Sequence, residues 1–322
     1  MSRIFQRGGT MLVLAALFLS LSLPAQALFD LDDQATGDSP KPIAENLTLT
    51  TYKNVAVEGT FAAVDPDGEG VTFRITKNPA RGAVTQAEEG SAVFTYTPYE
   101  DKLGKDSFTY VAEDASGNVS QPALVSVKIT RPDTKVTYAD MSGHPAHKAA
   151  LALAAEDVFV GEQMGQTWFF RPEAQVTREE FLAMAMDVTG METLPEAKMT
   201  GFSDDDSISV WAKPYVASAL RSGMIQGTSC GEEGAAFVPS RTITQTEAAV
   251  LLDRLMRVAD VADTGKLTGE AAPVWAHQSV VNLEAVGVLE GSANLNGDLT
   301  RAQAAELLLS AMEVLDFRES IW

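Results

Sequence analysis

The sequence is poor in cysteine and histidine, which many catalytic and metal sites use. Among its 322 residues are one cysteine, Cys230, and three histidines. A single cysteine excludes an internal disulfide, and Cys230 is expected to be a small, buried or half-buried residue. His144 and His147 lie three residues apart, but no third zinc ligand is near them in sequence. Phosphate-loop, nucleophile-elbow and zinc-protease motifs are also missing, so we expect no catalytic residue and no zinc site.

Positive charge is scarce as well. The chain has 24 Lys and Arg against 44 Asp and Glu, which gives a formal net charge of −20. A surface this acidic repels nucleic acid and anionic lipid, so neither is an expected partner. Calcium, cationic surfaces and neutral polymers remain as possible binding partners.

Long apolar runs are missing except at the N-terminus. Residues 1–27 combine Arg3 and Arg7, an apolar stretch from Met11 to Leu23, and an A-x-A sequence at 25–27, which is typical of a cleaved secretory signal peptide. The stretch is short for a membrane span, which makes an uncleaved anchor the minor alternative. We therefore expect a secreted mature chain without a membrane span.

The segment that follows the predicted signal peptide changes from linker to strand patterns. Residues 28–41 are polar and turn-rich, as in a linker, and residues 42–131 are strand-like. Runs that alternate β-branched or aromatic residues with polar ones are separated by Gly- and Asp-rich turns, which predicts a β-sandwich of about one hundred residues. The predicted strands are 71–76, 92–98, 106–114 and 123–130, and Phe94, Tyr96, Phe108 and Tyr110 are expected to lie in the core.

This segment resembles the bacterial immunoglobulin-like or cadherin-like domains of surface proteins. The resemblance rests on a D-P-D-G turn, a P-x-x-G turn, and the patterns F-T-Y-x-P and G-x-D-x-F-x-Y. Carboxylates in its turns are calcium candidates because hard cations take several oxygen ligands. The favoured alternative is a polar turn capped by Asp, since the EF-hand pattern is incomplete. The calcium candidates are Asp65, Asp67, Glu69 and Asp114.

From residue 132 onwards, one short pattern occurs three times. A Thr is followed three residues later by Glu or Gln and then by a run rich in Ala, Leu and Met, which predicts a helix with a capping box. A second helical pattern, a glycine turn and an irregular loop precede each box, which indicates an internal repeat of helix–loop–helix units. The capping pairs are Thr177 with Glu180, Thr244 with Glu247, and Thr300 with Gln303, and the turns are at Gly161, Gly227 and Gly291.

The repeated unit resembles the S-layer homology (SLH) repeat of bacterial cell-surface proteins. The family pattern has an aromatic-x-Asp opening, a helix near His-Trp-Ala, a loop ending in Phe-x-Pro, and then Thr-Arg-Ala-Glu. The resemblance implies three repeats, at 132–192, 198–260 and 264–317. Matching residues include Tyr138, Asp140, Phe170, Pro172 and Arg178 in the first unit, Phe202, Asp204, Trp211, Phe237 and Pro239 in the second, and Trp275, Ala276 and Arg301 in the third.

The resemblance also implies a site. SLH repeats assemble into a pseudo-threefold spindle whose grooves hold a pyruvylated amino sugar of the secondary cell-wall polysaccharide. Arg at the first helical position presents a planar fork to a carboxylate, next to free N–H groups and the positive end of the helix dipole. The implied binding residues are Arg178, Arg301, Gln245, Trp211, Lys213 and Trp275.

The residues by themselves leave alternatives open. Core packing is the favoured role for Trp211 and Trp275. For Arg178 and Arg301, a solvated helix start explains the sequence as well as ligand contact does. The acidic runs at 204–206 and 232–233 are interpreted as loop surface. Because no unit keeps every expected group, we expect one or two working grooves rather than three.

Taken together, these patterns predict an all-β sandwich followed by an all-α repeat domain. The expected function is that of a secreted, S-layer-associated protein without enzyme activity, anchored non-covalently to the bacterial wall and presenting the sandwich as a spacer or adhesion module. One alternative is a protein–protein interaction module of the cell envelope with degenerate repeats. Another is a carbohydrate-binding accessory of a secreted hydrolase system.

Overall fold

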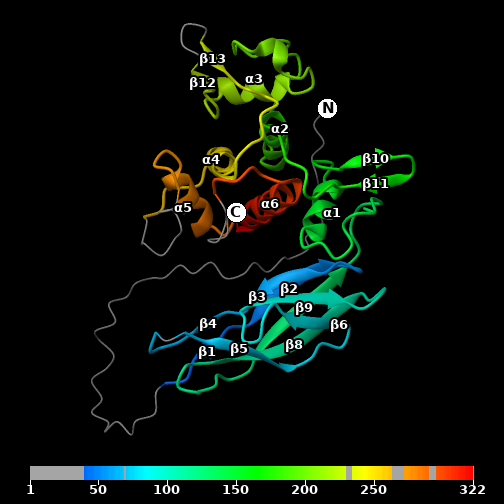
Figure 1. Cartoon of the computed structure of the whole chain (residues 1–322), viewed down its shortest axis with the longest axis vertical. Helices are drawn as coiled ribbons and strands as arrows, with labels where there is room; N and C mark the ends of the chain where they lie inside the picture. Colours follow the sequence, from blue (N-terminus) through cyan, green and yellow to red (C-terminus); the bar gives the residue numbers. More distant parts are fainter. Residues whose placement is uncertain (1–39, 69, 230–233, 263–271, 290–294, 322) are drawn as a thin grey trace. The chain divides into compact units, whose positions relative to one another are not determined.

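The chain folds into two compact units, one that ends at Arg131 and one that begins at Pro132. The computed structural model describes residues 40–68, 70–229, 234–262, 272–289 and 295–321 (Figure 1). The first unit is built of strands and the second mainly of helices, which confirms the predicted order of classes. The predicted signal peptide, most of the predicted linker, and Cys230 lie outside the described residues. Within the described ranges, no helix is long and apolar enough to cross a membrane.

The first unit is a β-sandwich. A four-stranded sheet has the order β2-β9-β8-β5, a three-stranded sheet has the order β3-β7-β6, and β1 and β4 form a short pair. Strands β2 and β9 are parallel, whereas β8 runs antiparallel to both of its neighbours. The strands are β1 (Ile43–Ala44), β2 (Leu47–Tyr52), β3 (Val57–Thr60), β4 (Ala63–Val64), β5 (Thr72–Lys77), β6 (Gly82–Gln86), β7 (Val93–Pro98), β8 (Gly104–Glu113) and β9 (Ala123–Thr130).

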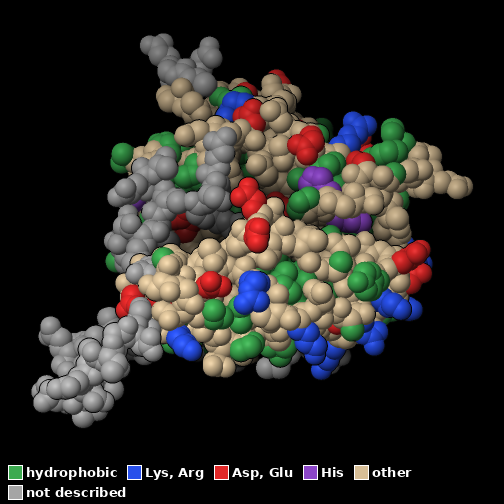
Figure 2. All heavy atoms as spheres, turned by 60° about the horizontal axis from the view of Figure 1, so that its bottom comes forward, with side chains coloured by type: hydrophobic (Ala, Val, Ile, Leu, Met, Phe, Trp, Pro, Cys, Tyr) green, Lys and Arg blue, Asp and Glu red, His purple; other side chains and the backbone are tan. Residues whose placement is uncertain are grey.

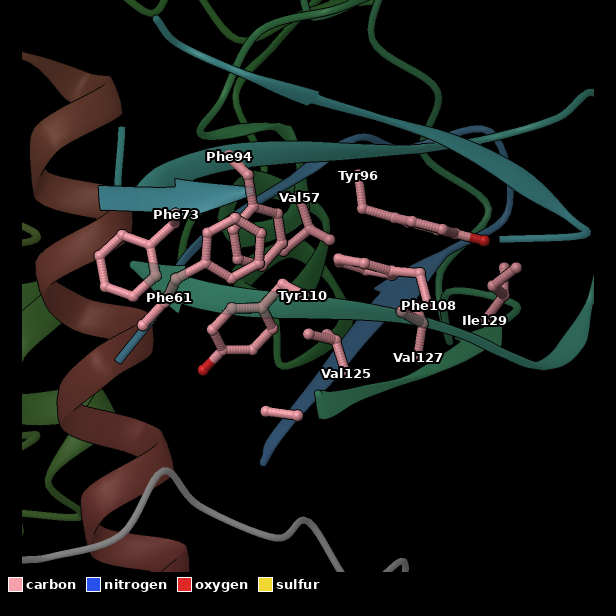
Figure 3. Close-up of a cluster of buried hydrophobic side chains, with 12 residues drawn as sticks. Val57, Phe61, Phe73, Phe94, Tyr96, Phe108, Tyr110, Val125, Val127 and Ile129 are labelled. Carbon is pink, nitrogen blue, oxygen red and sulfur yellow. The ribbon is translucent and has the colours of Figure 1, made fainter. Parts of the chain in front are cut away.

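An aromatic cluster fills the space between the two sheets (Figure 3). Phe94, Tyr96, Phe108 and Tyr110 are fully buried, as predicted. The Phe61 ring stacks on those of Phe94 and Tyr110, with both pairs of ring centroids 4.2 Å apart. Each buried aromatic ring removes a large apolar area from water, so this cluster is the main stabilising element of the sandwich.

Two glycines and one carboxylate adapt the sandwich to its large rings. A Cβ atom at Gly59 would lie 2.6 Å from Cζ of Phe94, and one at Gly82 would lie 2.5 Å from Cζ of Tyr96. The Tyr96 hydroxyl donates to Asp106 at 2.8 Å. Burial and the Asp106 carboxylate both raise the pKa of Tyr96, so this phenol stays protonated. The ring therefore packs in the core while its polar end is paired.

The calcium candidates of the sandwich lie in hydrogen-bonded turns. Both carboxylate oxygens of Asp114 accept from Asn118, the backbone N–H at 2.8 Å and the side-chain amide at 2.9 Å. Asp65 accepts from the backbone N–H of Asp67 at 3.4 Å. Glu69 lies outside the described residues. In the described part of the chain, no three His, Cys, Asp or Glu side chains are grouped where they could hold a metal ion.

The described residues of the second unit form three pairs of helices, with a loop between the two helices of each pair. In each pair the second helix is the one with the predicted capping box, and these helices, α2, α4 and α6, contact one another. Two loops carry short hairpins, β10 (Glu162–Met164) with β11 (Thr167–Phe169) and β12 (Thr228–Ser229) with β13 (Ala235–Ala236). The helices are α1 (His147–Ala155), α2 (Arg178–Val188), α3 (Lys213–Arg221), α4 (Gln245–Met256), α5 (His277–Ala285) and α6 (Arg301–Ile321), and a short 3₁₀ helix, η1, spans Asp205–Ser207.

A closed ring of three backbone hydrogen bonds joins these pairs. The N–H of Val176 donates to the carbonyl of Leu299 at 3.0 Å, that of Leu299 to Ile243 at 2.8 Å, and that of Ile243 to Val176 at 3.0 Å. All three side chains are buried. Each residue immediately precedes a capping Thr, so equivalent positions of the three segments meet in one place.

Candidate functional site

The capped helices begin as their sequence patterns predict. The Thr177 side chain accepts from the Glu180 N–H, and the Glu180 carboxylate accepts from the Thr177 N–H at 2.9 Å. The same reciprocal pair is present at Thr244 and Glu247. At the start of α6, the Thr300 N–H donates to the side chain of Gln303 at 3.0 Å, and Thr300 Oγ1 accepts from the Gln303 N–H at 3.2 Å.

The first N–H groups of these helices are not free, however. For α2, the N–H of Arg178 donates to the carbonyl of Arg241 at 2.9 Å and that of Glu179 to Pro239 at 3.2 Å. The prediction that free N–H groups would add to an anion site is therefore wrong, because the loop of a neighbouring segment occupies them. The corresponding pairs are Gln245 with Gly297 and Thr246 with Leu295 for α4, and Arg301 with Ala174 and Ala302 with Pro172 for α6.

Two carboxylates hold the loops that make these contacts. Asp140 accepts from the N–H groups of Phe170 and Arg171 at 2.9 and 2.7 Å. Asp204 accepts in the same way from Phe237 and Val238, at 2.8 and 2.7 Å. Arg171 and Val238 both have a left-handed backbone, with φ of 55° and 56°. The interpretation of Asp204 as loop surface is therefore wrong, since it fixes a strained turn by accepting from its backbone.

Arg178 is held by the loop and the helix of the next segment. Its Nε donates to the Phe237 carbonyl at 3.0 Å, and its Nη1 donates to the Glu247 carboxylate at 3.2 Å. The guanidinium carbon lies 5.3 Å from the centroid of the Phe237 ring. Only 16% of the side chain is exposed. The Arg178 fork is thus fixed before any ligand arrives.

Arg301 has a similar setting at the start of α6. Its guanidinium carbon lies 4.5 Å from the Phe159 ring centroid and 5.6 Å from that of Phe170. Its Nη1 donates to Glu162 at 3.3 Å. Its Nε is buried, and among the described residues it has no hydrogen-bond partner. A buried donor left unpaired is costly, so an acceptor placed here would be bound favourably.

Two cavities lie beside these arginines in the described part of the second unit. Groove A, of about 280 Å³, contains Arg301 together with Trp211. Groove B, of about 350 Å³, contains Arg178 together with Trp275. The remaining lining of groove A is Val158, Phe159, Val176, Glu180, Ala183, Met184, Asp187 and Tyr215. That of groove B is Leu182, Met224, Ile225, Gln226, Gly227, Thr228, Phe237, Ile243, Glu247, Val250, Leu251 and Arg254.

The two tryptophans are surface residues. Trp211 is 50% exposed and Trp275 is 61% exposed, so the prediction that they pack in the core is wrong. The next residue in each segment, Ala212 or Ala276, is fully buried instead. Each tryptophan lies two residues before the first residue of its helix, and the alanine between them is buried while the indole is exposed.

Two of the predicted binding residues lie elsewhere. Lys213 pairs with Asp205 at 2.5 Å, with 13% and 17% of the two side chains exposed. The Lys213 ammonium, aided by Thr200, lowers the pKa of Asp205 to about 2. Asp205 is therefore not simple loop surface. Among the described residues, neither groove is lined by Lys213 or Gln245.

Other lining residues were not identified from sequence. Phe159 and Tyr215 add aromatic rings to groove A, and Asp187 and Arg254 add charges to grooves A and B respectively. Helical periodicity counted from the capping Thr would have placed Asp187 and Arg254 on the same face as Glu180 and Glu247.

Comparisons with known proteins agree with the two-part architecture. Residues 37–131 match the bacterial cadherin-like domain family, and residues 137–182 match the S-layer homology domain family. Both are surface or anchoring modules and not catalytic ones.

Three curated relatives match parts of the chain. An amylopullulanase of Thermoanaerobacterium thermosulfurigenes is 38% identical over 89 residues, which are 27% of this chain and 5% of the relative. The exoglucanase XynX of Acetivibrio thermocellus is also 38% identical over 89 residues, 27% of this chain and 8% of the relative. A surface-layer 125 kDa protein of Lysinibacillus sphaericus is 29% identical over 125 residues, 38% of this chain and 10% of the relative. The chain thus spans a small part of these relatives. The S-layer homology match and the surface-layer relative indicate association with the cell surface.

Proposed function

We propose that the second unit is a set of three SLH repeats that anchors a secreted chain to secondary cell-wall polysaccharide without a covalent bond. The repeats are residues 132–192, 198–260 and 264–317. The observation that carries this proposal is that grooves A and B are each assembled from all three segments in the same cyclic way.

The cyclic assembly can be followed element by element. Groove A takes one face of α2, the tryptophan that precedes α3, and the arginine that begins α6. Groove B takes the corresponding face of α4, the tryptophan that precedes α5, and the arginine that begins α2. The ring through Val176, Ile243 and Leu299 supports a pseudo-threefold spindle, because it gives the three segments equivalent backbone bonds.

The lining of both grooves suits a saccharide. An exposed indole offers an apolar face to a sugar ring, while the arginine fork and nearby carboxylates pair with polar substituents. A guanidinium also matches the geometry of a carboxylate such as that of a pyruvyl group. The buried Nε of Arg301 adds a donor that a ligand acceptor in groove A would satisfy.

A third groove of the same kind would lack its main groups. Its arginine position is occupied by Gln245, and its tryptophan position by Pro145. Without a cation or an indole it would bind a sugar weakly. We therefore propose two working grooves, and we assign the sandwich the role of a spacer or adhesion module carried by the anchor.

Retention of the full chain on purified cell-wall sacculi tests the anchoring function. We expect binding to sacculi that keep their secondary polysaccharide and little binding to sacculi from which it has been removed. Equal retention on the stripped sacculi would instead favour a protein-interaction module of the envelope, and no retention on either would refute wall binding.

Matched variants make this test specific for the grooves. Trp211→Ala combined with Trp275→Ala should abolish retention. Val210→Ala combined with Val274→Ala should leave it unchanged, because these neighbouring side chains are 85% and 96% exposed and line neither groove. Equal retention of both double variants would show that the indoles do not contribute to binding.

A further inference from the structure

Grooves A and B are built from the same positions of equivalent helices. Counted from the capping Thr, each groove uses the residue just before it and those three, six, seven and ten residues after it. Four of these positions have the same chemistry in both helices, and the last has opposite charge. The sets are Val176, Glu180, Ala183, Met184 and Asp187 in groove A, and Ile243, Glu247, Val250, Leu251 and Arg254 in groove B.

The charges around groove B favour an anion. Arg178 and Arg254 both line it. Its carboxylate, Glu247, lies between two arginines, 3.2 Å from Arg178 and 2.5 Å from Arg241. Arg254 is exposed, and its Nη1 donates to the Met224 carbonyl at 3.1 Å. Among the lining residues of groove B, two arginines therefore face one carboxylate.

The charges around groove A have the opposite balance. Arg301 shares the carboxylate of Glu162 with Arg171, at 3.3 and 2.9 Å, which repeats the arrangement at Glu247. Groove A then adds Glu180 and Asp187, with no second arginine among its lining residues.

A tyrosine holds the Asp187 carboxylate at groove A. Tyr215 also lines the groove, and its hydroxyl donates to Asp187 at 3.3 Å. A carboxylate placed near Asp187 would be repelled, whereas sugar hydroxyls could donate to it.

We propose that the two grooves recognise different sugars of one polymer: groove B binds the carboxylate-bearing unit, and groove A binds an uncharged unit. Asp187 and Arg254, at the same position of α2 and α4, determine this difference. The inference rests on the wall-binding function proposed above and adds to it a division of labour between the grooves. A polymer in which neutral sugars separate the acidic ones would then place an acidic sugar in groove B and a neutral sugar in groove A.

Because each groove has its own tryptophan, binding can be followed groove by groove. The indole N–H signals of Trp211 and Trp275 in a ¹⁵N-labelled sample of the full chain are assigned with Trp211→Phe and Trp275→Phe. The probes are a pyruvylated N-acetyl amino-sugar methyl glycoside and the same glycoside without its pyruvyl group, which is uncharged. We expect the pyruvylated probe to shift the Trp275 signal, and the uncharged probe to shift the Trp211 signal at lower concentration than the pyruvylated one does.

Charge exchange at the paired position tests the proposed cause. Arg254→Asp should weaken the response of Trp275 to the pyruvylated probe about tenfold or more, because a charge-assisted contact is lost and a repulsive one is added. Asp187→Arg should increase the response of Trp211 to this probe by a similar factor. The milder variants Arg254→Gln and Asp187→Asn should move both responses in the same directions. Arg221→Asp, an exposed charge change that lies in neither groove, should change neither.

The outcomes separate this inference from the function on which it depends. Equal responses of both indoles to the pyruvylated probe, unaffected by the charge exchange, would overturn the division of labour and leave wall binding intact. If neither probe shifts either indole signal and the chain is also not retained on sacculi, both the division of labour and wall binding are overturned.

Discussion

The two units of this chain are stabilised in different ways. The sandwich closes on a continuous aromatic core. The interior of the helical unit is rich in buried alanines, and carboxylates and backbone hydrogen bonds fix its loops.

The two units also differ in their content of charged residues. Residues 40–131 have nine Lys and Arg against 12 Asp and Glu, and residues 132–322 have 13 against 28. Lys and Arg side chains gather along the face of the sandwich visible in Figure 2. The comparison teaches that in the helical unit the polar groups that stabilise the fold also shape the grooves.

The strongest test of this contrast is a cavity in the aromatic core. Phe94→Ala should destabilise the sandwich by about 3–5 kcal/mol, because the ring is fully buried and its neighbours cannot fill the space. Chemical denaturation followed by tyrosine fluorescence or circular dichroism would measure the loss. Tyr99→Ala, at a side chain that is 50% exposed, is the control and should cost little. A small loss for Phe94→Ala would show that the sandwich does not depend on its aromatic cluster.

The corresponding test in the helical unit removes a loop-holding carboxylate. Asp204→Ala leaves the N–H groups of Phe237 and Val238 without their acceptor, and we expect a loss of about 2–3 kcal/mol. Amide hydrogen exchange should show faster exchange at these two positions. Asp206→Ala changes an exposed neighbour and should leave both amides protected. Unchanged exchange in Asp204→Ala would contradict the assigned role.

A third prediction uses pH. The pKa of Asp205 is lowered from 3.8 to about 2 by Lys213 and Thr200, so the charged form is favoured in the folded state. The resulting stability is fully present above about pH 4 and is lost as pH falls towards 2, because the unfolded chain takes up the proton first. Thermal melts at steps of pH should show this loss in the wild type and a smaller one in Asp205→Asn. Equal pH dependence in the two proteins would remove Asp205 as the cause.

The smallest expected change in stability is at Arg301. Arg301→Ala removes a hydrogen bond to Glu162, which keeps its pairing with Arg171, and the contacts with the Phe159 and Phe170 rings, so we expect a loss of about 1–2 kcal/mol. Retention on sacculi should nevertheless fall strongly, since groove A loses its cation. A large drop in the melting temperature with retention intact would assign this arginine to the fold and not to the ligand.

The parts of the fold that follow from local patterns could be predicted from the sequence. Alternation of β-branched or aromatic residues with polar ones predicts β5, β7, β8 and β9, and the Thr-x-x-Glu/Gln pattern predicts the starts of α2, α4 and α6. Strand β2, with the sequence LTLTTY, was not identified, and four of its six residues are only partly buried. Its pairing with β9 is parallel and brings together residues far apart in the chain, which no local pattern reports.

The parts of the site that depend on the meeting of distant segments could not be predicted. The exposure of Trp211 and Trp275 is decided by which neighbour turns inward at a helix start. The N–H groups at the helix starts are occupied by carbonyls from another segment, and the role of Asp204 depends on a loop more than thirty residues away. The opposite charges of Asp187 and Arg254 could not be recognised as a difference between two sites until the structure showed that α2 and α4 line equivalent cavities.

The ring through Val176, Ile243 and Leu299 has a consequence for the order in which the anchor matures. It cannot close until the third segment is present, and bringing such widely separated residues together is entropically costly and slow. Groove A also needs the arginine at the start of α6, and groove B needs the tryptophan that precedes α5. In the proposed wall-bound protein, the sandwich can therefore fold first, and the grooves would become able to bind the polymer only in the final stage of folding.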